Sequence, residues 1–225
     1  MVDIDMAPSK FARKSFVHLA KRKRLDPAEN RVYILPALEV KENNKMPETR
    51  TEVIQRWQQD VRPFHDWCDI CYKKSQDYNR WIHIDEELDG APADSQVNTA
   101  YDIKYHLPFE PYYIAGSLSD LPLYDERFRG YGYNKVEQCY EMSLKNWTFT
   151  SLDSQFISHN GWKSATTDST VKTYQQQVNE QHFNNFKKEL KIGLGLTHHH
   201  SHKTKEKEGK VEKFFPHSKL VADKK

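Results

Sequence analysis

The chain has 225 residues and a formal net charge of only +2, because 34 Lys and Arg are balanced by 32 Asp and Glu. This balance argues against a general binder of polyanions, so no nucleic-acid partner is expected. No apolar stretch approaches the ~20 residues of a membrane span, and the first residues do not form a secretory signal, so the printed sequence alone predicts a cytosolic protein with one domain.

The first residues, MVDIDMAPS, predict a short strand over residues 1–6 that carries two acids. Side chains alternate along a strand, so Asp3 and Asp5 are expected on one face. Two neighbouring carboxylates resist ionisation unless a cation lies between them, and oxygen ligands of this kind suit Mg²⁺ or Mn²⁺. On spacing alone, however, a strand that ends in a solvated turn explains so short a pattern better.

A helix and then a strand are expected next. Ser9 can cap a helix that runs to about Lys23. The basic run at 21–24 is interpreted as complementing the negative partial charge at the C-terminal end of this helix, in preference to forming a nucleic-acid-binding patch. Residues 31–40 (RVYILPALEV) predict a strand in which Pro36 marks an edge or a bulge.

A second helix is expected to begin at Pro47, where Thr49 and Glu52 have the spacing of a capping box. Strand and helix signals therefore alternate along the first part of the chain. Such alternation favours an α/β architecture with a mixed sheet flanked by helices.

Residues 61–111 are irregular, aromatic and polar, and a loop this long is either functional or hides regular elements. The segment contains a C-x-x-C pair, Cys68 and Cys71. The pair can be half of a zinc site, a redox pair or a local disulfide. Zinc is the least favoured, because Cys139 has no close Cys or His partner to complete four ligands.

The second half returns to regular patterns. Strands are expected at 112–115, 147–152 and 155–158, and a helix from about Asn134. A last helix is expected from Val171 until Gly193 stops it, with one flank formed by Tyr174, Val178, His182, Phe183 and Phe186.

Residues 196–225 predict a disordered tail rich in His and Lys, because the stretch 197–213 has almost no apolar residues to bury. The folded domain is therefore expected within residues 1–195. A metal- or nucleic-acid-binding function of the histidines at 198–200 and 202 is a disfavoured hypothesis, since low complexity favours a solvated tail.

Three segments stand out for their chemistry: DID at 3–5, YDERFRGYGYNK at 124–135 and SHNGWK at 158–163. With EVIQRWQQDVRPF, the C-x-x-C pair, NRW at 79–81 and FEPYYIAG at 109–116, they resemble the β-1,4-glucuronyltransferase family, and more distantly the C-terminal glucuronyltransferase domain of LARGE-type bifunctional enzymes. The resemblance extends from the first residues to about Gly195.

The resemblance implies a GT-A glycosyltransferase fold and a Mn²⁺ cofactor. In such enzymes the D-x-D motif holds the ion against the donor diphosphate, so Asp3, Asp5 and His159 are the expected metal ligands. Gly161, which permits close backbone approach, and Lys163 are the expected donor-binding residues. The ion stabilises the charge that develops on the leaving UDP.

The resemblance also assigns an acceptor side to the GYG segment, with Arg127, Tyr131, Asn134 and Lys135 as its residues. In several inverting GT-A enzymes an acidic pair follows this turn and supplies the catalytic base. Here Asn134 and Lys135 follow the turn, and neither side chain can act as the carboxylate base. The candidate bases are therefore Asp125 and Glu126, with Glu137 as a third, while a purely structural ion pair between Asp125 and Arg127 is equally expected.

The function implied by the resemblance is inverting transfer of glucuronate from UDP-glucuronate to a xylose-terminated glycan in protein O-mannosylation, at the lumenal face of the Golgi membrane. The expected partners are a UDP-sugar donor and a glycan acceptor, and homodimerisation stays open. Related enzymes carry a membrane anchor, a stem and the first part of the GT-A domain before D-x-D, so the chain is expected to be the C-terminal portion of such an enzyme. The alternative is an inactive remnant that acts as a binding or scaffold protein.

Overall fold

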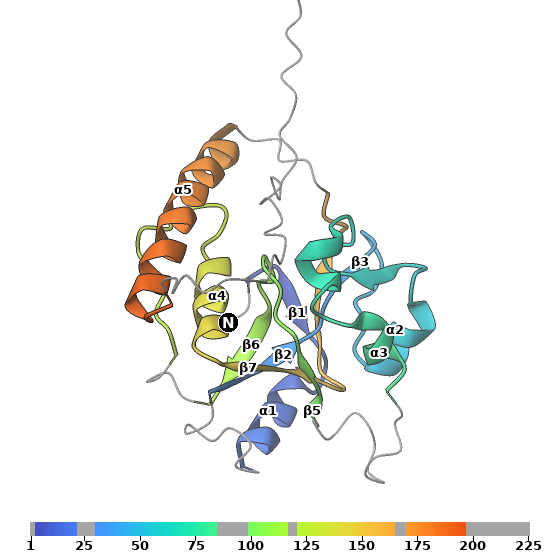
Figure 1. Ribbon diagram of the computed structural model, residues 1–225. Coiled ribbons are helices and arrows are strands. Elements are labelled where there is room, and N and C mark those ends of the chain that lie inside the picture. Colours follow the sequence, from blue (N-terminus) through green and yellow to red (C-terminus); the bar gives the residue numbers. More distant parts are fainter. Residues whose placement is uncertain (1–2, 22–29, 85–98, 117–120, 165–169, 197–225) are drawn as a thin grey trace, which may run out of the picture. The chain divides into compact units, whose positions relative to one another are not determined.

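The computed structural model describes residues 3–21, 30–84, 99–116, 121–164 and 170–196 (Figure 1). The chain divides into two compact units. The first comprises Met1–Leu123 and Cys139–Ser164, and the second comprises Tyr124–Gln138 and the residues from Ala165 onward. The predicted tail, apart from Leu196, lies outside the described residues.

The first unit contains two four-stranded mixed sheets. One has the order β1-β8-β3-β4, with β3 and β8 parallel, and the other has the order β5-β7-β2-β6, with β2 and β7 parallel. The strands are β1 (Met6–Pro8), β2 (Arg31–Leu35), β3 (Ala37–Val40), β4 (Val61–Pro63), β5 (Thr99–Ile103), β6 (Tyr112–Ala115), β7 (Thr148–Leu152) and β8 (Ile157–Asn160).

The helices are α1 (Ala12–Lys21), α2 (Arg50–Arg56), α3 (Tyr78–Ile82), α4 (Val136–Leu144) and α5 (Thr170–Gly193), with one π-helical turn, η1 (Asp69–Lys73). Mixed sheets with flanking helices confirm the α/β class that the alternating sequence pattern predicts. In α2, Thr49 Oγ1 accepts from the Glu52 amide at 3.2 Å, while Glu52 Oε2 accepts from the Glu48 amide at 2.6 Å. The predicted capping interaction is therefore present, except that the Glu52 side chain accepts from the amide of Glu48 and not from that of Thr49.

The single strand predicted over residues 31–40 is wrong, because Pro36 separates two strands that belong to different sheets. β2 is an inner strand of one sheet and β3 an inner strand of the other. Proline has no amide hydrogen for a ladder and its fixed φ ends the strand. Its carbonyl still accepts from the Ile157 amide at 3.0 Å, so the crossing point is anchored to β8.

The strand predicted over residues 1–6 is also wrong, since β1 begins only at Met6. Ile4 and Asp5 form a turn that is closed by a hydrogen bond from the Met6 amide to the Asp3 carbonyl at 3.1 Å. Ser9 does not cap α1 through its side chain either; its hydroxyl donates to Gln155 Oε1 at 2.6 Å. The two aspartates are thus arranged by a turn and not by strand alternation.

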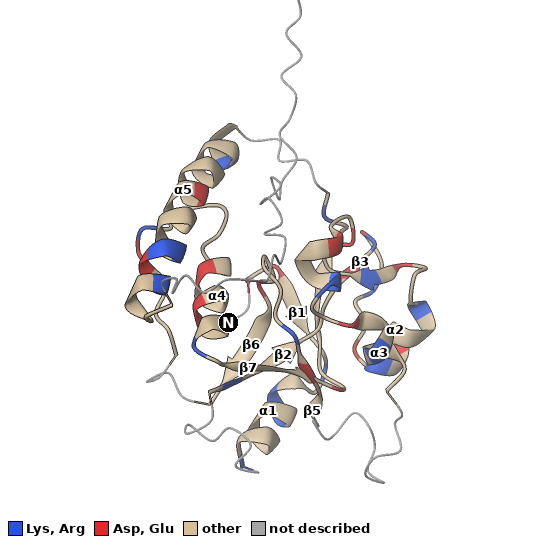
Figure 2. Cartoon of the chain, in the orientation of Figure 1, with Lys and Arg blue, Asp and Glu red and all other residues tan. Residues whose placement is uncertain are grey.

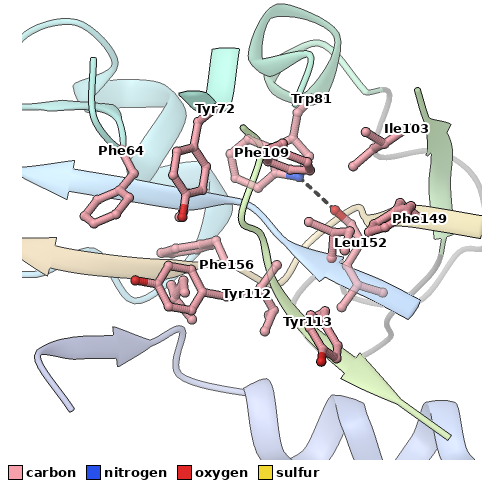
Figure 3. Close-up of a cluster of buried hydrophobic side chains, with 14 of the residues drawn as sticks. Phe64, Tyr72, Trp81, Ile103, Phe109, Tyr112, Tyr113, Phe149, Leu152 and Phe156 are labelled. Carbon is pink, nitrogen blue, oxygen red and sulfur yellow. Dashed lines mark hydrogen bonds between the residues drawn. The ribbon is translucent and has the colours of Figure 1, made fainter. Parts of the chain in front are cut away.

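The described residues within 61–111 form β4, η1, α3 and β5, and they supply much of the aromatic core. Figure 3 shows Phe64, Tyr72, Trp81 and Phe109 from this segment packed with residues of both sheets. The Trp81 indole donates to the Leu152 carbonyl at 2.9 Å, so this buried polar tip is satisfied. Cys68 and Cys71 form a disulfide, which is the third of the alternatives that the sequence left open.

The second unit is built on α5, whose Phe183 and Phe186 are buried against Phe128. These two residues confirm the predicted apolar flank, but Tyr174 on the same flank is 68% exposed. The helix ends at Gly193 as expected, and Gly195 takes the left-handed backbone with φ of +68°.

Both signs of charge are interspersed along α5 and over the other elements (Figure 2). This distribution agrees with the small net charge of +2. Among the helices in the described part of the chain, none has the length and apolar character of a membrane span.

Candidate donor-phosphate and metal site

The ends of β1 and β8 bring Asp5 and His159 together. Met6 pairs with His159 in the antiparallel β1–β8 ladder, and Asp5 directly precedes Met6. As a result, Asp5 Oδ2 lies 3.4 Å from His159 Nε2. A carboxylate and an imidazole at this separation can share one cation or one proton.

A hydrogen bond to its own loop orients the His159 ring. Nδ1 lies 2.7 Å from the Gly161 carbonyl, and because a carbonyl only accepts, Nδ1 carries the proton of this bond. In the neutral ring, Nε2 therefore keeps its lone pair toward Asp5, as a metal ligand requires. Phe64 packs near the ring, with 6.0 Å between the centroids.

Gly161 has a φ of +91°, a conformation that glycine adopts without strain. Its amide donates to the Val40 carbonyl at 2.8 Å and so continues the β3–β8 pairing beyond Asn160. The turn that follows returns the chain toward β1. Lys163 Nζ lies 3.3 Å from Asp5 Oδ2, so three of the predicted site residues, Asp5, His159 and Lys163, meet at one place.

Asp3 has a different neighbour. The Tyr112 hydroxyl, from β6 in the other sheet, donates to Asp3 Oδ2 at 2.8 Å. Tyr112 is 1% exposed, and burial together with the nearby Asp3 carboxylate raises the pKa of its hydroxyl well above the usual value. In the part of the chain that the structure describes, no group of three or more His, Cys, Asp and Glu side chains is gathered closely enough to hold a metal ion. Asp3 thus stands apart from the other two predicted ligands.

The predicted acceptor segment lies in the second unit, where an ion-pair network organises it. Asp125 accepts from Arg127 Nε at 2.9 Å, and the same guanidinium donates to Glu189 Oε2 at 2.7 Å. Hydrogen bonds from Arg127 hold the pKa of the Asp125 carboxyl below its usual value, against the effect of burial. Asp125 therefore has the structural ion pair that the sequence suggested, and its basicity is reduced.

The other predicted residues of this segment differ in their surroundings. Glu126 is exposed and makes no bond with another side chain that the structure describes. Glu137 is fully buried, and its Oε1 accepts from the Asp125 amide at 3.1 Å. Asn134 Nδ2 reaches the Gly130 carbonyl at 3.5 Å, and Lys135 is half-buried. Of the candidate bases, Glu126 is the one whose carboxylate is open to a substrate.

Two polar residues of α5 hold the GYG turn, and the sequence did not identify them. Asn179, 1% exposed, donates its amide to the carbonyls of Arg129, Tyr131 and Gly132 at 2.8–3.1 Å. Gln175 Oε1 accepts from the Tyr131 amide at 2.9 Å. A Cβ on Gly130 would lie 2.4 Å from the Gln175 side chain, so the glycine is required for this close approach. The only signal in the sequence is a run of amides inside an amphipathic helix.

Glu39 is a further residue that the sequence analysis missed. It is fully buried in β3, next to His159 in the β3–β8 register, and its carboxylate pairs with Arg62 Nη2 at 2.9 Å. Burial raises the pKa of the Glu39 carboxyl above its usual value, although its hydrogen-bond donors partly offset this rise. A single acid within the apolar run ILPALEV was the available signal.

Comparison with known proteins shows that the sequence of the chain matches one protein family. The family described as "glycosyl-transferase for dystroglycan" matches residues 1–194 of the chain. The chain belongs to this glycosyltransferase family. The resemblance inferred from the three sequence segments is thereby confirmed, and the mixed α/β architecture is consistent with a GT-A member of the family.

The family relatives are longer than this chain. The chain is 32% identical over 193 residues to β-1,4-glucuronyltransferase 1 of Danio rerio, covering 85% of this chain and 42% of that protein. It is 32% identical over 196 residues to the Homo sapiens enzyme of the same name, covering 85% and 44%. Xylosyl- and glucuronyltransferase LARGE1 of Mus musculus is 36% identical over 63 residues, covering 28% and 8%. The chain thus spans less than half the length of these relatives.

Proposed function

We propose that this chain carries the metal- and diphosphate-binding part of an inverting glucuronyltransferase, which transfers glucuronate from UDP-glucuronate to a xylose-terminated glycan. Transfer of a glucuronyl group follows from the names of the relatives, β-1,4-glucuronyltransferase 1 and the xylosyl- and glucuronyltransferase LARGE1. UDP-glucuronate as the donor, inversion, the xylose terminus and protein O-mannosylation are inferences from the sequence resemblance. The observation that carries the proposal is the 3.4 Å approach of Asp5 and His159, with Lys163 beside them.

The residues present fit a divalent cation in their chemistry. Asp5 and His159 would hold Mn²⁺ directly, since an imidazole among oxygen ligands favours Mn²⁺ over Mg²⁺. Asp3 would become the third ligand through a shift of the turn at residues 3–5, and the Tyr112 hydroxyl would orient its carboxylate, as partners of ligating carboxylates commonly do. Bound there, the ion would act as a Lewis acid on the leaving diphosphate.

The protein's own groups would carry out the remaining steps. In the structure, Lys163 forms a partly exposed ion pair with Asp5. Such a pair contributes only ~0–1 kcal/mol. The Lys163 ammonium can therefore leave Asp5 for a phosphate oxygen of the donor at little cost in free energy. On the acceptor side, a carboxylate takes the proton of the attacking hydroxyl while the sugar–phosphate bond breaks and UDP leaves. We assign this role to Glu126 in preference to Asp125, because the Asp125 carboxylate already accepts hydrogen bonds from Arg127.

The disulfide between Cys68 and Cys71 supports a lumenal site of action. Structural disulfides form in oxidising compartments and are rare in the cytosol. This supports the Golgi lumen, expected from the resemblance, over the cytosolic interpretation of the bare sequence.

Substitution of Asp5 by Asn tests the proposal, because the amide removes the charge that a cation requires while keeping the shape of the side chain. We expect Asp5→Asn to lower Mn²⁺-dependent release of UDP by about a hundredfold or more, with loss of Mn²⁺ binding measured by electron paramagnetic resonance. Asp69→Asn is the matched control, since Asp69 is 91% exposed and pairs only with Lys73. Near-normal turnover and Mn²⁺ binding in Asp5→Asn would refute the proposed role.

A non-catalytic binding protein is the second candidate. It is favoured by the contacts that already engage the two carboxylates, the Tyr112 hydroxyl on Asp3 and the Lys163 ammonium on Asp5. On this alternative, wild-type protein and Asp5→Asn would both fail to bind Mn²⁺ and to release UDP.

A further inference from the structure

Glu39 lies at the centre of the strands that form the candidate site. In the register of the first sheet it is opposite His159 on β8 and opposite Arg62 on β4. Directly paired residues place their side chains on the same face, so Glu39 shares a face with the proposed metal ligand. A carboxylate that is fully buried is costly unless charged or polar groups satisfy it.

Two donors from the segment 62–65 bind this one carboxylate. The His65 amide donates to Oε1 at 2.8 Å, and Arg62 Nε donates to Oε2 at 3.0 Å. Among the groups that lower the pKa of the Glu39 carboxyl, the backbone amide of Lys163 has the smallest effect. The carboxylate therefore fixes Arg62 and the residues after β4, and the loop that leaves β8 lies beside it.

The partner of Glu39 also reaches the same loop. The Arg62 guanidinium lies over the Trp162 ring, with its central carbon 4.2 Å from the ring centroid. A guanidinium that is fixed by a buried carboxylate is a rigid platform for such a contact. The loop is thus held through the Trp162 side chain, one residue before Lys163.

We infer that Glu39, acting with Arg62, is the positioning residue that fixes the loop 161–163 and aims Lys163 at the donor diphosphate. This inference rests on the proposed function, in which Lys163 binds that diphosphate. Gly161, with its φ of +91°, turns the loop away from β8, and the bond from the Gly161 amide to the Val40 carbonyl is its last ladder contact. Without the Glu39 carboxylate, the Arg62 guanidinium would lose the partner that fixes it next to Trp162.

The test is a double-mutant cycle between Glu39→Gln and Lys163→Ala. The measured quantity is the affinity for UDP in the presence of MnCl₂, by titration calorimetry, with thermal unfolding recorded for every variant. We expect Glu39→Gln to weaken UDP binding roughly tenfold, as loss of a partner behind a binding group commonly does. We expect no further weakening when Lys163 is already alanine, because Glu39 acts through Lys163. Glu42→Gln, an exposed acid three residues along the chain, is the matched control and should bind UDP as the wild type does.

Arg62→Lys provides a second test that keeps the positive charge next to Glu39. It removes the planar group over Trp162, so it should weaken UDP binding in the same direction and shift the tryptophan fluorescence spectrum. Additive effects of Glu39→Gln and Lys163→Ala would overturn the inference, and so would normal UDP affinity in both Glu39→Gln and Arg62→Lys. If Lys163→Ala alone leaves UDP binding unchanged, the role of Lys163 in the proposed function fails, and the inference fails with it.

Discussion

Tyr112 connects the candidate metal site to the second sheet of the first unit. Its ring is buried in the aromatic core (Figure 3), while its hydroxyl donates to Asp3 Oδ2 at 2.8 Å. A buried ring has few alternative orientations, so the hydroxyl restricts where the Asp3 carboxylate can lie. The hydrogen bond from the Met6 amide to the Asp3 carbonyl restrains the backbone of Asp3 as well.

Removal of this hydroxyl gives a prediction for metal binding. We expect Tyr112→Phe to lower the affinity for Mn²⁺ about tenfold, because a partner that orients a ligating carboxylate is lost while the ring still packs. The free energy of unfolding should change by only about 1 kcal/mol, the usual net value of one hydrogen bond.

The measurement is a Mn²⁺ titration followed by electron paramagnetic resonance. Tyr113→Phe is the matched control, since Tyr113 is the next residue of β6, is 3% exposed and points to the opposite face of the strand. Unchanged or tighter Mn²⁺ binding in Tyr112→Phe would show that the hydroxyl does not prepare Asp3 for the metal.

At the scale of elements, one helix holds the proposed acceptor loop through two side-chain amides, of which Asn179 makes the larger number of bonds. Asn179 of α5 donates to three backbone carbonyls of residues 129–132, and the loop contains three residues with positive φ, Gly130, Gly132 and Tyr133. Such a backbone keeps its shape only while outside partners satisfy it.

We expect Asn179→Ala to lower the free energy of unfolding by about 1–3 kcal/mol, because it leaves buried carbonyl groups without their donor. The loop should also become a preferred site of tryptic cleavage, at Arg127 or Arg129. Thermal unfolding and limited proteolysis measure the two effects. Asn184→Ala, at an exposed position on the same helix, should show neither, and equal behaviour of the two variants would exclude a special role of Asn179.

The sequence predicted those elements whose signals are local. The capping pair Thr49 and Glu52 located α2, and the apolar period located Phe183 and Phe186 on α5, because both depend on residues within a few positions of each other. Residues 61–111 could not be assigned in the same way. Their aromatic residues belong to a core shared by two sheets, and partners from distant parts of the chain decide which side is buried.

The site was predictable only in part, for the same reason. The approach of Asp5 to His159 depends on the β1–β8 register, and family resemblance, not spacing, brought the two residues together in the sequence analysis. Glu39 and Asn179 were missed because an isolated acid or amide has no distinctive pattern. Their importance comes from donors and acceptors on other elements.

At the scale of the whole molecule, carboxyl groups with lowered and with raised pKa values make the free energy of unfolding depend on pH in opposite directions. Arg127 lowers the pKa of Asp125 and of Glu189, so these groups contribute stability above their ordinary pKa values of 3.8 and 4.5, and the contribution is lost as the pH falls through the lowered values. Burial raises the pKa of Glu39, whose contribution is therefore present at low pH and lost as the pH rises through its raised value. The two effects belong to different units, so substitutions can separate them.

Asp125→Asn should remove the part of the acid sensitivity that Asp125 contributes in the second unit. At pH 7 we expect the variant to unfold about 2 °C below the wild type, since a partly exposed ion pair contributes no more than ~1 kcal/mol. The difference should shrink as the pH falls below about 4 and vanish once the pH lies below the lowered pKa of the wild-type Asp125 carboxyl, which is then protonated as well. Thermal unfolding from pH 7 down to about pH 2 measures this convergence, with Glu126→Gln as the control at the adjacent exposed acid. A constant difference between Asp125→Asn and the wild type at every pH would mean that the side chain stabilises the loop by packing, and not through its charge.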